Sequence, residues 1–164
     1  MVTPTPAFTD EIAANGGASV MMCFQCGTCT ASCPSGKNTA YRTRKLIRAA
    51  QLGLKEETMC SEDLWQCTTC YTCSERCPRD VQIVDVITAL RNIAVANGRL
   101  YEGHKKVGAN LIKVGHTVEN NDKIKALRKS LGLPENPPTV MDNAKAMADF
   151  DKILELTGFK KLVG

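Results

Sequence analysis

Two short stretches with the same cysteine spacing decide how this chain folds. Residues 23–34 read CFQCGTCTASCP and residues 67–78 read CTTCYTCSERCP. We call them run 1 and run 2. Each has the order C-x2-C-x2-C-x3-C followed by proline, which is the bacterial ferredoxin signature. In that signature three closely spaced thiolates hold one [4Fe-4S] cluster and the fourth reaches the neighbouring cluster. The pattern therefore predicts two [4Fe-4S] clusters whose ligands are exchanged between the runs.

The exchange of fourth cysteines gives two definite ligand sets. The predicted ligands of cluster 1 are Cys23, Cys26, Cys29 and Cys77, and those of cluster 2 are Cys67, Cys70, Cys73 and Cys33. Each closing proline has a fixed φ and no N–H, so it turns the chain away after the fourth ligand. Two clusters that share ligands in this way must be neighbours, which suits the passage of single electrons between them.

Other uses of clustered cysteines fit this chain less well. Structural zinc usually takes two C-x2-C knuckles separated by a dozen or more residues, because the knuckles clasp one ion from opposite sides. A disulfide framework fits poorly with an odd total of nine cysteines and a reducing compartment. A purely structural role for two clusters stays open as an alternative. The ninth cysteine, Cys60, lies outside both spacings and is expected to be a small buried hydrophobe, with a redox role as the alternative.

Composition limits the protein class. The chain has 164 residues, of which 43% are hydrophobic and 5% aromatic, and its formal net charge is +4. No stretch approaches the roughly 20 apolar residues of a membrane span, and the first residues lack the basic and apolar regions of a secretory signal. We therefore expect a cytoplasmic protein without a membrane span. Two oxidised clusters with their thiolates would bring the net charge close to zero.

The segments around the runs have helical rather than strand periodicity. The pattern predicts a basic helix over about 38–52 and a longer helix over about 81–97 that ends at Gly98. On the first helix, one predicted stripe consists of Lys37, Tyr41, Arg44, Lys45 and Arg48. This stripe is either a solvated face or a docking face for an acidic protein partner. It is short and lacks interleaved aromatic residues, so we expect no nucleic acid partner.

The chain is expected to form a mostly α protein of two parts. Residues 1–98 form a two-cluster α-helical ferredoxin-type domain, with a short first helix capped by Thr9 and a turn capped by Ser61. Residues 99–164 form a helical C-terminal extension packed on it, with apolar residues that we expect to be core more often than partner surface. His104 and His116 are isolated from each other and from the runs, so neither is expected to be a ligand.

Several features of substrate chemistry are missing from the sequence. It has no G-x-G-x-x-G motif for a flavin or nicotinamide, no Cys-Cys pair of a catalytic cluster domain, and no nucleophile with an evident base. No catalytic residue is therefore predicted. The residues indicate an electron relay that takes electrons from one protein and gives them to another, with substrate chemistry elsewhere.

Six stretches of the sequence are informative beyond the cysteine spacing. They are CFQCGTCTASCPSG, AYRTRKLIRAA, LWQCTTCYTCSERCPRD and ITALRN, followed by VENNDKIKALRKSLGLPENPPTV and ILELTGF. In these stretches the chain resembles the C subunit of the CoB-CoM heterodisulfide reductase of methanogens. The resemblance implies a relay protein with no activity alone, between a flavin-containing A subunit of heterodisulfide reductase and its catalytic B subunit, which reduces CoM-S-S-CoB in methanogenesis. It also implies a hydrogenase or formate dehydrogenase that feeds the complex.

Two alternatives remain at this point. The cysteine signature alone is shared with iron-sulfur subunits of succinate dehydrogenase and glycolate oxidase, so a relay in a membrane-bound respiratory or sulfur-oxidising complex is the first. An iron-sulfur sensor is the second, but such a protein needs an output module and none is evident. Proteins that co-purify with this chain would discriminate these possibilities.

Overall fold

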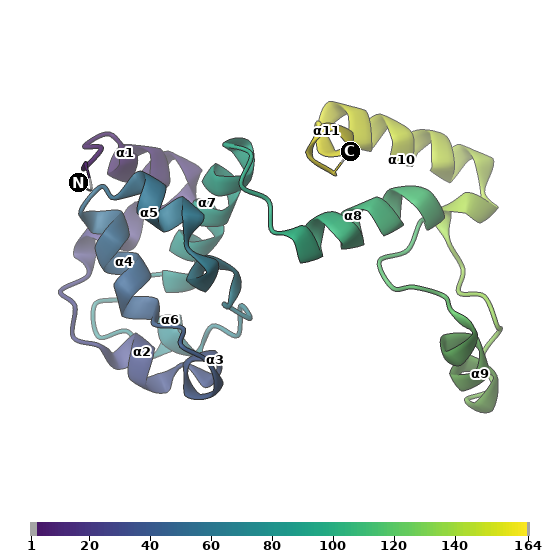
Figure 1. Ribbon diagram of the computed structural model, residues 1–164, viewed down its shortest axis with the longest axis horizontal. Helices are drawn as coiled ribbons and strands as arrows, with labels where there is room; N and C mark the ends of the chain where they lie inside the picture. Colours follow the sequence, from purple (N-terminus) through teal and green to yellow (C-terminus); the bar gives the residue numbers. More distant parts are fainter. Residues whose placement is uncertain (1–2, 164) are drawn as a thin grey trace. The chain divides into compact units, whose positions relative to one another are not determined.

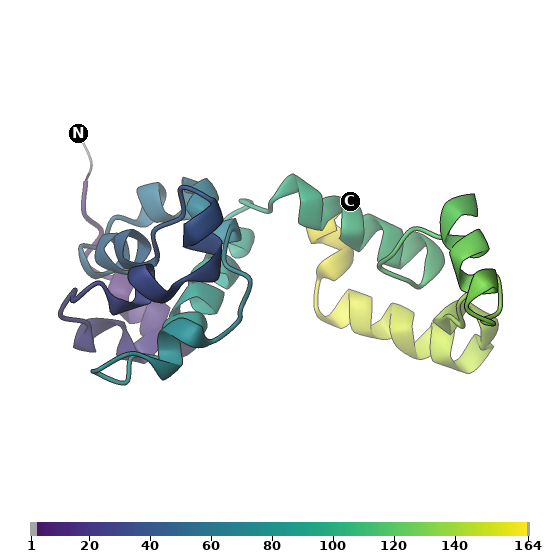
Figure 2. The same ribbon diagram turned by 90° about the horizontal axis from the view of Figure 1, so that it is seen from below.

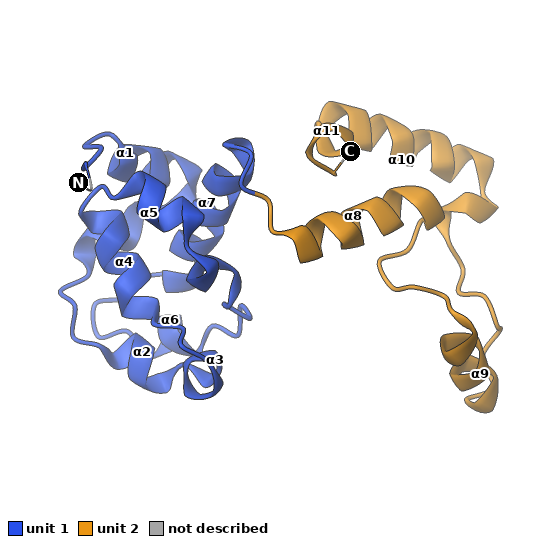
Figure 3. Ribbon diagram, in the orientation of Figure 1, with its two compact units in different colours: residues 1–99 blue, residues 100–164 orange. Residues whose placement is uncertain are grey.

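Short helices and their connections make up the described part of the chain, residues 3–163, in this computed structural model (Figure 1). No strand occurs among these residues. The prediction of a mostly α-helical fold is therefore confirmed. The chain divides into unit 1, Met1–Arg99, and unit 2, Leu100–Gly164, which are coloured separately in Figure 3. None of the described helices combines the length and the apolar character needed to cross a membrane.

Unit 1 contains both cysteine runs. Its elements are α1 (Phe8–Ile12), η1 (Ala13–Gly17), η2 (Ala18–Met22), α2 (Thr28–Ser32), α3 (Pro34–Asn38), α4 (Thr43–Gln51), α5 (Lys55–Cys60), η3 (Glu62–Trp65), α6 (Thr72–Glu75) and α7 (Ile83–Ala96). Two of these elements lie inside the runs, because α2 follows the second cysteine of run 1 and α6 follows the second cysteine of run 2. The connections around them are short, so the runs are held close to the core.

Helix α7 is the main core element of unit 1. It packs against η1, α5 and α6, and Figure 2 shows it in teal beside the purple N-terminal segments. Its sequence IVDVITALRNIAVA is apolar on most of its circumference, which is typical of a buried helix. Gly17 permits the close approach of η1, since a Cβ there would lie 2.5 Å from Ile12 Cγ2 and 3.4 Å from Ala89 Cβ. The helix ends where Gly98 adopts a φ of 77°, as predicted.

The predicted basic helix is shorter than expected and begins later. Residues 34–38 form the separate helix α3, and the chain at Thr39 is extended, with φ −134° and ψ 173°. Helix α4 therefore starts only at Thr43. The placement of Tyr41 on an exposed basic stripe is wrong, because its side chain is 1% exposed and belongs to the core. The remaining cations are not part of that core.

Two predicted caps are also wrong. Thr9 lies inside α1, whose N-cap is Ala7, and the Thr9 hydroxyl donates to the Pro6 carbonyl at 3.3 Å. Ser61 does occupy the N-cap position of η3, but its side chain makes no capping hydrogen bond there. Phe8 and Leu64, buried side chains of these two elements, are both 0% exposed.

Unit 2 has a small core. It consists of α8 (Glu102–Val114), α9 (Asp122–Ser130), η4 (Val140–Asp142), α10 (Ala144–Leu156) and α11 (Phe159–Val163). Helices α8 and α11 meet at Gly108, where a Cβ would lie 2.8 Å from Val163 Cγ2. Asn143 caps α10 by accepting the N–H groups of Lys145 and Ala146, both at 3.0 Å.

Many apolar side chains of unit 2 are not buried within it. Leu127 is 54% exposed, Leu131 67%, Ile153 57% and Leu156 79%. Within unit 2 alone these side chains do not form a core. The expectation that the apolar residues of the extension are mainly core includes its packing against residues 1–98, and both stay predictions.

Candidate iron-sulfur site

The two runs repeat in backbone conformation as well as in sequence. The residue two positions after the first cysteine has a positive φ in both, 66° at Gln25 and 53° at Thr69. The residue four positions after it is also left-handed, with φ 90° at Gly27 and 62° at Tyr71. Left-handed backbone costs a non-glycine residue roughly 1–2 kcal/mol. Such strain, repeated in two copies, is typical of a functional site.

The first and fourth cysteines of each run accept backbone hydrogen bonds, from the residue two positions on for the first cysteine and from the residue three or four positions on for the fourth. The donors are the N–H groups of Gln25 to Cys23 Sγ (3.4 Å), Thr69 to Cys67 Sγ (3.5 Å), Gly36 to Cys33 Sγ (3.4 Å) and Val81 to Cys77 Sγ (3.3 Å). Four of the eight sulfurs therefore each accept a hydrogen bond from a backbone N–H within the run or just after it.

The second cysteine of each run is exposed and lies beside a threonine. Cys26 Sγ is 3.3 Å from Thr28 Oγ1, and Cys70 Sγ is 3.5 Å from Thr72 Oγ1. These hydrogen bonds lower the pKa of both thiols below the ordinary cysteine value. The sequence match between Thr28 and Thr72 therefore has a structural counterpart in the two runs.

The third cysteines are buried where the runs meet. Cys29 lies on α2 and Cys73 on α6, two helices in contact with each other, and their side chains are only 9% and 8% exposed. Burial raises the pKa of Cys29. Burial first, then the nearby Cys67 and Cys29, raise the pKa of Cys73 to about 11. The influence of Cys29 on Cys73 places the third cysteines of the two runs near each other.

One small cavity, of about 10 Å³, brings together cysteines from both runs. Cys33 of run 1 and Cys67, Cys70 and Cys73 of run 2 all line it. The set matches the four predicted ligands of cluster 2, including the crossed-over cysteine. The assignment of ligands stays a prediction, and this arrangement supports it.

The predicted ligands of cluster 1 are grouped less completely. Cys23 and Cys26 lie close enough to Cys29 to contribute to its raised pKa. Cys77 is half-buried against the hydrophobic core of unit 1. Its membership of cluster 1 rests on the ferredoxin spacing and on the symmetry of the repeat.

The donor chemistry of both sets fits iron-sulfur clusters. Within residues 3–163 no three His, Cys, Asp or Glu side chains gather as the ligands of one metal ion would. A [4Fe-4S] cluster makes no such demand, because its four cysteines bind four different irons around a bulky cube. Cysteines arranged around a cavity, with N–H donors to their sulfurs, are compatible with that requirement.

Two polar side chains that the sequence analysis missed hold the runs in place. Gln51 at the end of α4 donates to the carbonyl of Val20 (3.1 Å) and to that of Cys23 (2.8 Å). Arg91 of α7 donates to the carbonyl of Leu64 (2.9 Å) and to that of Cys67 (2.7 Å). Both act on the first cysteine of a run from a helix distant in sequence. No local pattern signals such contacts.

The other side chains singled out near the runs have different environments. The prediction that Cys60 is buried is wrong, because this residue is exposed at the end of α5. Phe24 is 60% exposed and Tyr71 is 50% exposed, although both neighbour predicted ligands. His104 and His116 belong to unit 2, whereas both runs belong to unit 1.

Comparison with known proteins first defines the class. Residues 19–81 match a family model described as a 4Fe-4S dicluster domain, and this range contains all eight cysteines of the two runs. Unit 1 is thus a helical iron-sulfur domain of the kind that carries [4Fe-4S] clusters, in agreement with the predicted count of two.

Relatives along most of the chain then define the family. The C subunit of the H(2):CoB-CoM heterodisulfide,ferredoxin reductase of Methanothermobacter marburgensis is 51% identical over 157 residues, which cover 96% of this chain and 85% of that protein. The iron-sulfur C subunit of the CoB–CoM heterodisulfide reductase of Methanopyrus kandleri is 50% identical over 146 residues, covering 89% of this chain and 76% of that protein. The chain belongs to this family of iron-sulfur C subunits of heterodisulfide reductase, as the sequence resemblance indicated.

Proposed function

We propose that this chain relays single electrons from a flavin-containing A subunit to a catalytic B subunit that reduces CoM-S-S-CoB. Bound [4Fe-4S] clusters supply the reversible one-electron chemistry. The chain supplies the eight thiolates, the donors to their sulfurs and the surfaces that meet its partners. Cys23, Cys26, Cys29 and Cys77 would hold cluster 1, and Cys67, Cys70, Cys73 and Cys33 would hold cluster 2. The chain itself contributes no catalytic residue on this proposal.

The observation that carries the proposal is the position of Cys33. This residue belongs to run 1 but lines one cavity with Cys67, Cys70 and Cys73 of run 2. The contact between α2 and α6 also brings Cys29 near Cys73. Two cluster sites with crossed ligands would therefore be immediate neighbours, as an electron relay requires.

The names of the relatives indicate the source of electrons. A relative from Methanococcus maripaludis, 47% identical over 147 residues, is named as the C2 subunit of an H(2)/formate:CoB-CoM heterodisulfide,ferredoxin reductase. The name of the Methanothermobacter relative begins with H(2), while the name of one from Methanosarcina mazei, 41% identical, begins with ferredoxin and contains neither H(2) nor formate. Because the hydrogen- and formate-linked relatives are more similar to this chain, we propose that a hydrogenase or a formate dehydrogenase feeds its complex.

Electron delivery to the catalytic partner tests the relay. The anaerobically loaded chain is reduced chemically, freed of reductant and mixed with CoM-S-S-CoB and the oxidised B subunit of the same organism. We expect the chain to be reoxidised only when the B subunit is present, at one electron per cluster. Cys70→Ala should lose this delivery while Cys60→Ala retains it, because only Cys70 is a proposed ligand.

Two results would contradict the relay. Reduction of CoM-S-S-CoB by the chain without its catalytic partner would reveal a substrate site of its own. Delivery by Cys70→Ala at the rate of the unaltered chain would show that cluster 2 lies outside the electron path.

A further inference from the structure

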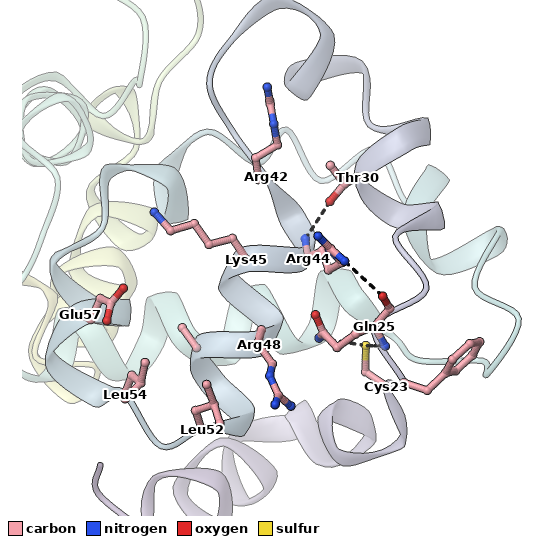
Figure 4. A pocket seen from close by; sticks show the side chains of 12 residues that line it. Cys23, Gln25, Thr30, Arg42, Arg44, Lys45, Arg48, Leu52, Leu54 and Glu57 are labelled. Carbon is pink, nitrogen blue, oxygen red and sulfur yellow. Dashed lines mark hydrogen bonds between the residues drawn. The ribbon is translucent and has the colours of Figure 1, made fainter. Parts of the chain in front are cut away.

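A basic groove runs along α4 beside run 1 (Figure 4). It has a volume of about 790 Å³, and Cys23 lies at one end while Glu57 lies at the other. Its basic side chains are Arg42, Arg44, Lys45 and Arg48. We call this hollow the α4 groove. A predicted ligand of cluster 1 is therefore part of a strongly cationic concave surface.

The cations of the α4 groove lack acidic partners. Among the described residues, none of the four forms an ion pair, whereas Lys55 nearby is paired with Glu11 at 2.7 Å. Arg42 donates to three backbone carbonyls, which fixes its position. Lys45 is exposed at its place on α4, and the contact of Arg48 with Gln51 is long, at 3.5 Å. These two charges are available to an external partner.

The shape and lining of the groove fit a protein surface better than a small anion. From Arg44 to Arg48 the cations extend over about 6 Å of helix α4, and Arg42 precedes its first residue, so they match several spaced carboxylates rather than one converging anion. Exposed apolar side chains accompany them, with Phe24 60% and Leu52 46% exposed. Aromatic and aliphatic anchors next to complementary charges are typical of protein interfaces.

Unit 2 of the same chain is a poor occupant on charge grounds. Residues 100–164 contain more Lys and Arg than Asp and Glu. A basic unit is repelled by a basic groove, while an acidic partner is attracted to it.

We propose that the α4 groove docks an acidic face of one of the proteins with which this chain exchanges electrons. The inference rests on the proposed relay function, and it identifies the surface through which one partner reaches the Cys23 side of unit 1. Electrostatic attraction then sets both the affinity and the orientation of that encounter.

The test uses the double variant Lys45→Glu/Arg48→Glu in the fully loaded chain. Lys106→Glu/Lys113→Glu on α8 is the matched control, because it changes net charge equally at exposed positions outside the groove. Binding to the purified A and B subunits is measured separately, in 0.05 M and in 1 M salt. We expect the groove variant to lose at least tenfold affinity for one of these two partners at low salt. The loss should shrink at 1 M salt, where the Debye length is about 3 Å.

Unchanged affinity of the groove variant for both partners would overturn the docking proposal. An equal loss in the α8 control would overturn it as well, since net charge alone would then explain the effect. Electron delivery by the unaltered chain, measured at saturating partner concentration, tests the relay function separately from the docking surface. If the unaltered chain delivers electrons normally while the groove variant binds normally, only the docking surface is wrong.

A second and independent observation concerns two buried hydroxyls in the other cavity. Tyr41 and Thr43 line it together with Cys33, Cys67, Cys70 and Cys73, and each of the two side chains is 1% exposed. Neither Tyr41 Oη nor Thr43 Oγ1 has a hydrogen-bond partner within the described chain. A buried hydroxyl without a partner costs roughly 1–3 kcal/mol. Two of them at the wall of one cysteine-lined cavity indicate that the cavity's occupant accepts their hydrogen bonds.

A tyrosine hydroxyl carries its proton, and is therefore a hydrogen-bond donor, across the physiological pH range. At the same sequence offset after run 2 stand Asp85 and Ile87, which lie inside α7.

We infer that Tyr41 and Thr43 donate hydrogen bonds to the sulfur-rich group held by Cys33, Cys67, Cys70 and Cys73. Donors to the sulfurs of an iron-sulfur cluster stabilise its more negative, reduced form and raise its reduction potential. Tyr41 and Thr43 would thus raise the reduction potential of cluster 2 relative to that of cluster 1. This inference also rests on the proposed ligand sets.

A redox titration of the loaded chain tests the inference. Thr43→Val keeps the side-chain shape and removes the hydroxyl, and Thr43→Ser retains the hydroxyl as the matched control. We expect Thr43→Val and Tyr41→Phe each to lower one of the two potentials, by about tenfold in the equilibrium constant or about 59 mV for a one-electron couple. The other potential should not move, and Thr43→Ser should resemble the unaltered chain.

Equal shifts of both potentials, or no shift in either variant, would overturn the inference. The proposed function is judged separately, from the iron content and the electron delivery of the unaltered chain. If the chain holds both clusters and relays electrons, but loss of either hydroxyl leaves both reduction potentials unchanged, only this assignment is refuted.

Discussion

At the residue scale, the two runs have different residues at the same left-handed position of the backbone. Gly27 and Tyr71 both precede a short helix in a left-handed conformation, with φ 90° and 62°. Glycine adopts this conformation without strain, whereas tyrosine does not. Run 1 therefore depends on Gly27 for the turn that presents Cys26, and run 2 maintains the same turn despite the side chain of Tyr71.

We predict that Gly27→Val destabilises the loaded chain by about 1–2 kcal/mol, because a β-branched residue at this φ is strained. Gly27→Asn should cost less, since asparagine tolerates the left-handed region. Thermal unfolding followed by the loss of cluster absorbance measures both. Equal melting temperatures for the two variants would show that backbone strain at this turn has no influence on stability.

The crossed ligand gives the sharpest residue-scale prediction. Cys33→Ala removes a thiolate from the cavity that also contains Cys67, Cys70 and Cys73. Anaerobically prepared chain should hold about eight iron and eight acid-labile sulfide, and the variant about four of each. Cys60→Ala, at an exposed cysteine outside the runs, should retain about eight.

Spectroscopy identifies which cluster the Cys33→Ala variant loses. The signal that also disappears in Cys70→Ala should be the missing one. If the variant instead loses the signal that disappears in Cys26→Ala, the crossed ligand assignment is wrong and each run holds its own cluster.

At the scale of elements, a long helix fixes the segment that carries the first ligand of run 2. Arg91 of α7 donates to the carbonyls of Leu64 and Cys67, and its guanidinium lies 5.7 Å from the Trp65 ring centre. Each such hydrogen bond from a charged donor contributes about 1.5–3 kcal/mol. The start of run 2 is therefore attached to the main core helix of the unit.

Arg91→Met should release this attachment while keeping much of the side-chain volume. We expect lower thermal stability and faster loss of iron to a chelator, by several-fold, because two carbonyls lose their donor. Asn92→Ala, at the next and exposed position of α7, is the control. Chelation at the same rate in Arg91→Met and Asn92→Ala would show that the attachment does not protect run 2.

The elements also show what sequence patterns can predict and why the rest escapes them. Cluster spacing is local and imposed by coordination chemistry, so the runs and the helices around them were predictable. Tyr41 was misplaced because a continuous helix was assumed from about residue 38, whereas the extended backbone at Thr39 and Arg42 interrupts it. The contacts of Gln51 and Arg91 join segments distant in sequence. Nothing in a single local pattern contains that information.

At the scale of the whole molecule, the family places this chain in an oxidoreductase complex, and its two units differ in what they bury. Among residues 3–163, the side chains of the hydrophobic core around the runs come from the segment between Phe8 and Ala94. Unit 2 buries few side chains of its own and exposes several large apolar ones, Leu156 most of all at 79%. Among the described residues, the two most exposed large apolar side chains, Leu156 and Leu131 at 67%, thus belong to unit 2, whereas the cysteine runs belong to unit 1.

This separation leads to a prediction about a chain ended after Arg99. Such a fragment keeps all eight cysteines of the runs and the complete core that contacts half-buried Cys23, Cys33, Cys67 and Cys77. It should therefore retain about eight iron and both cluster signals. A fragment that holds clearly fewer than eight iron would mean that unit 2 completes the cluster sites.

The melting temperature of the same fragment tests the role of the extension. If residues 99–164 pack on residues 1–98, as the sequence led us to expect, the full chain should melt at a higher temperature than the fragment. The reason is that burial of apolar area contributes about 25 cal/mol per Å², and Leu131 and Leu156 offer such area. Equal melting temperatures with full iron content would instead indicate that the apolar side chains of unit 2 remain free for another protein of the complex.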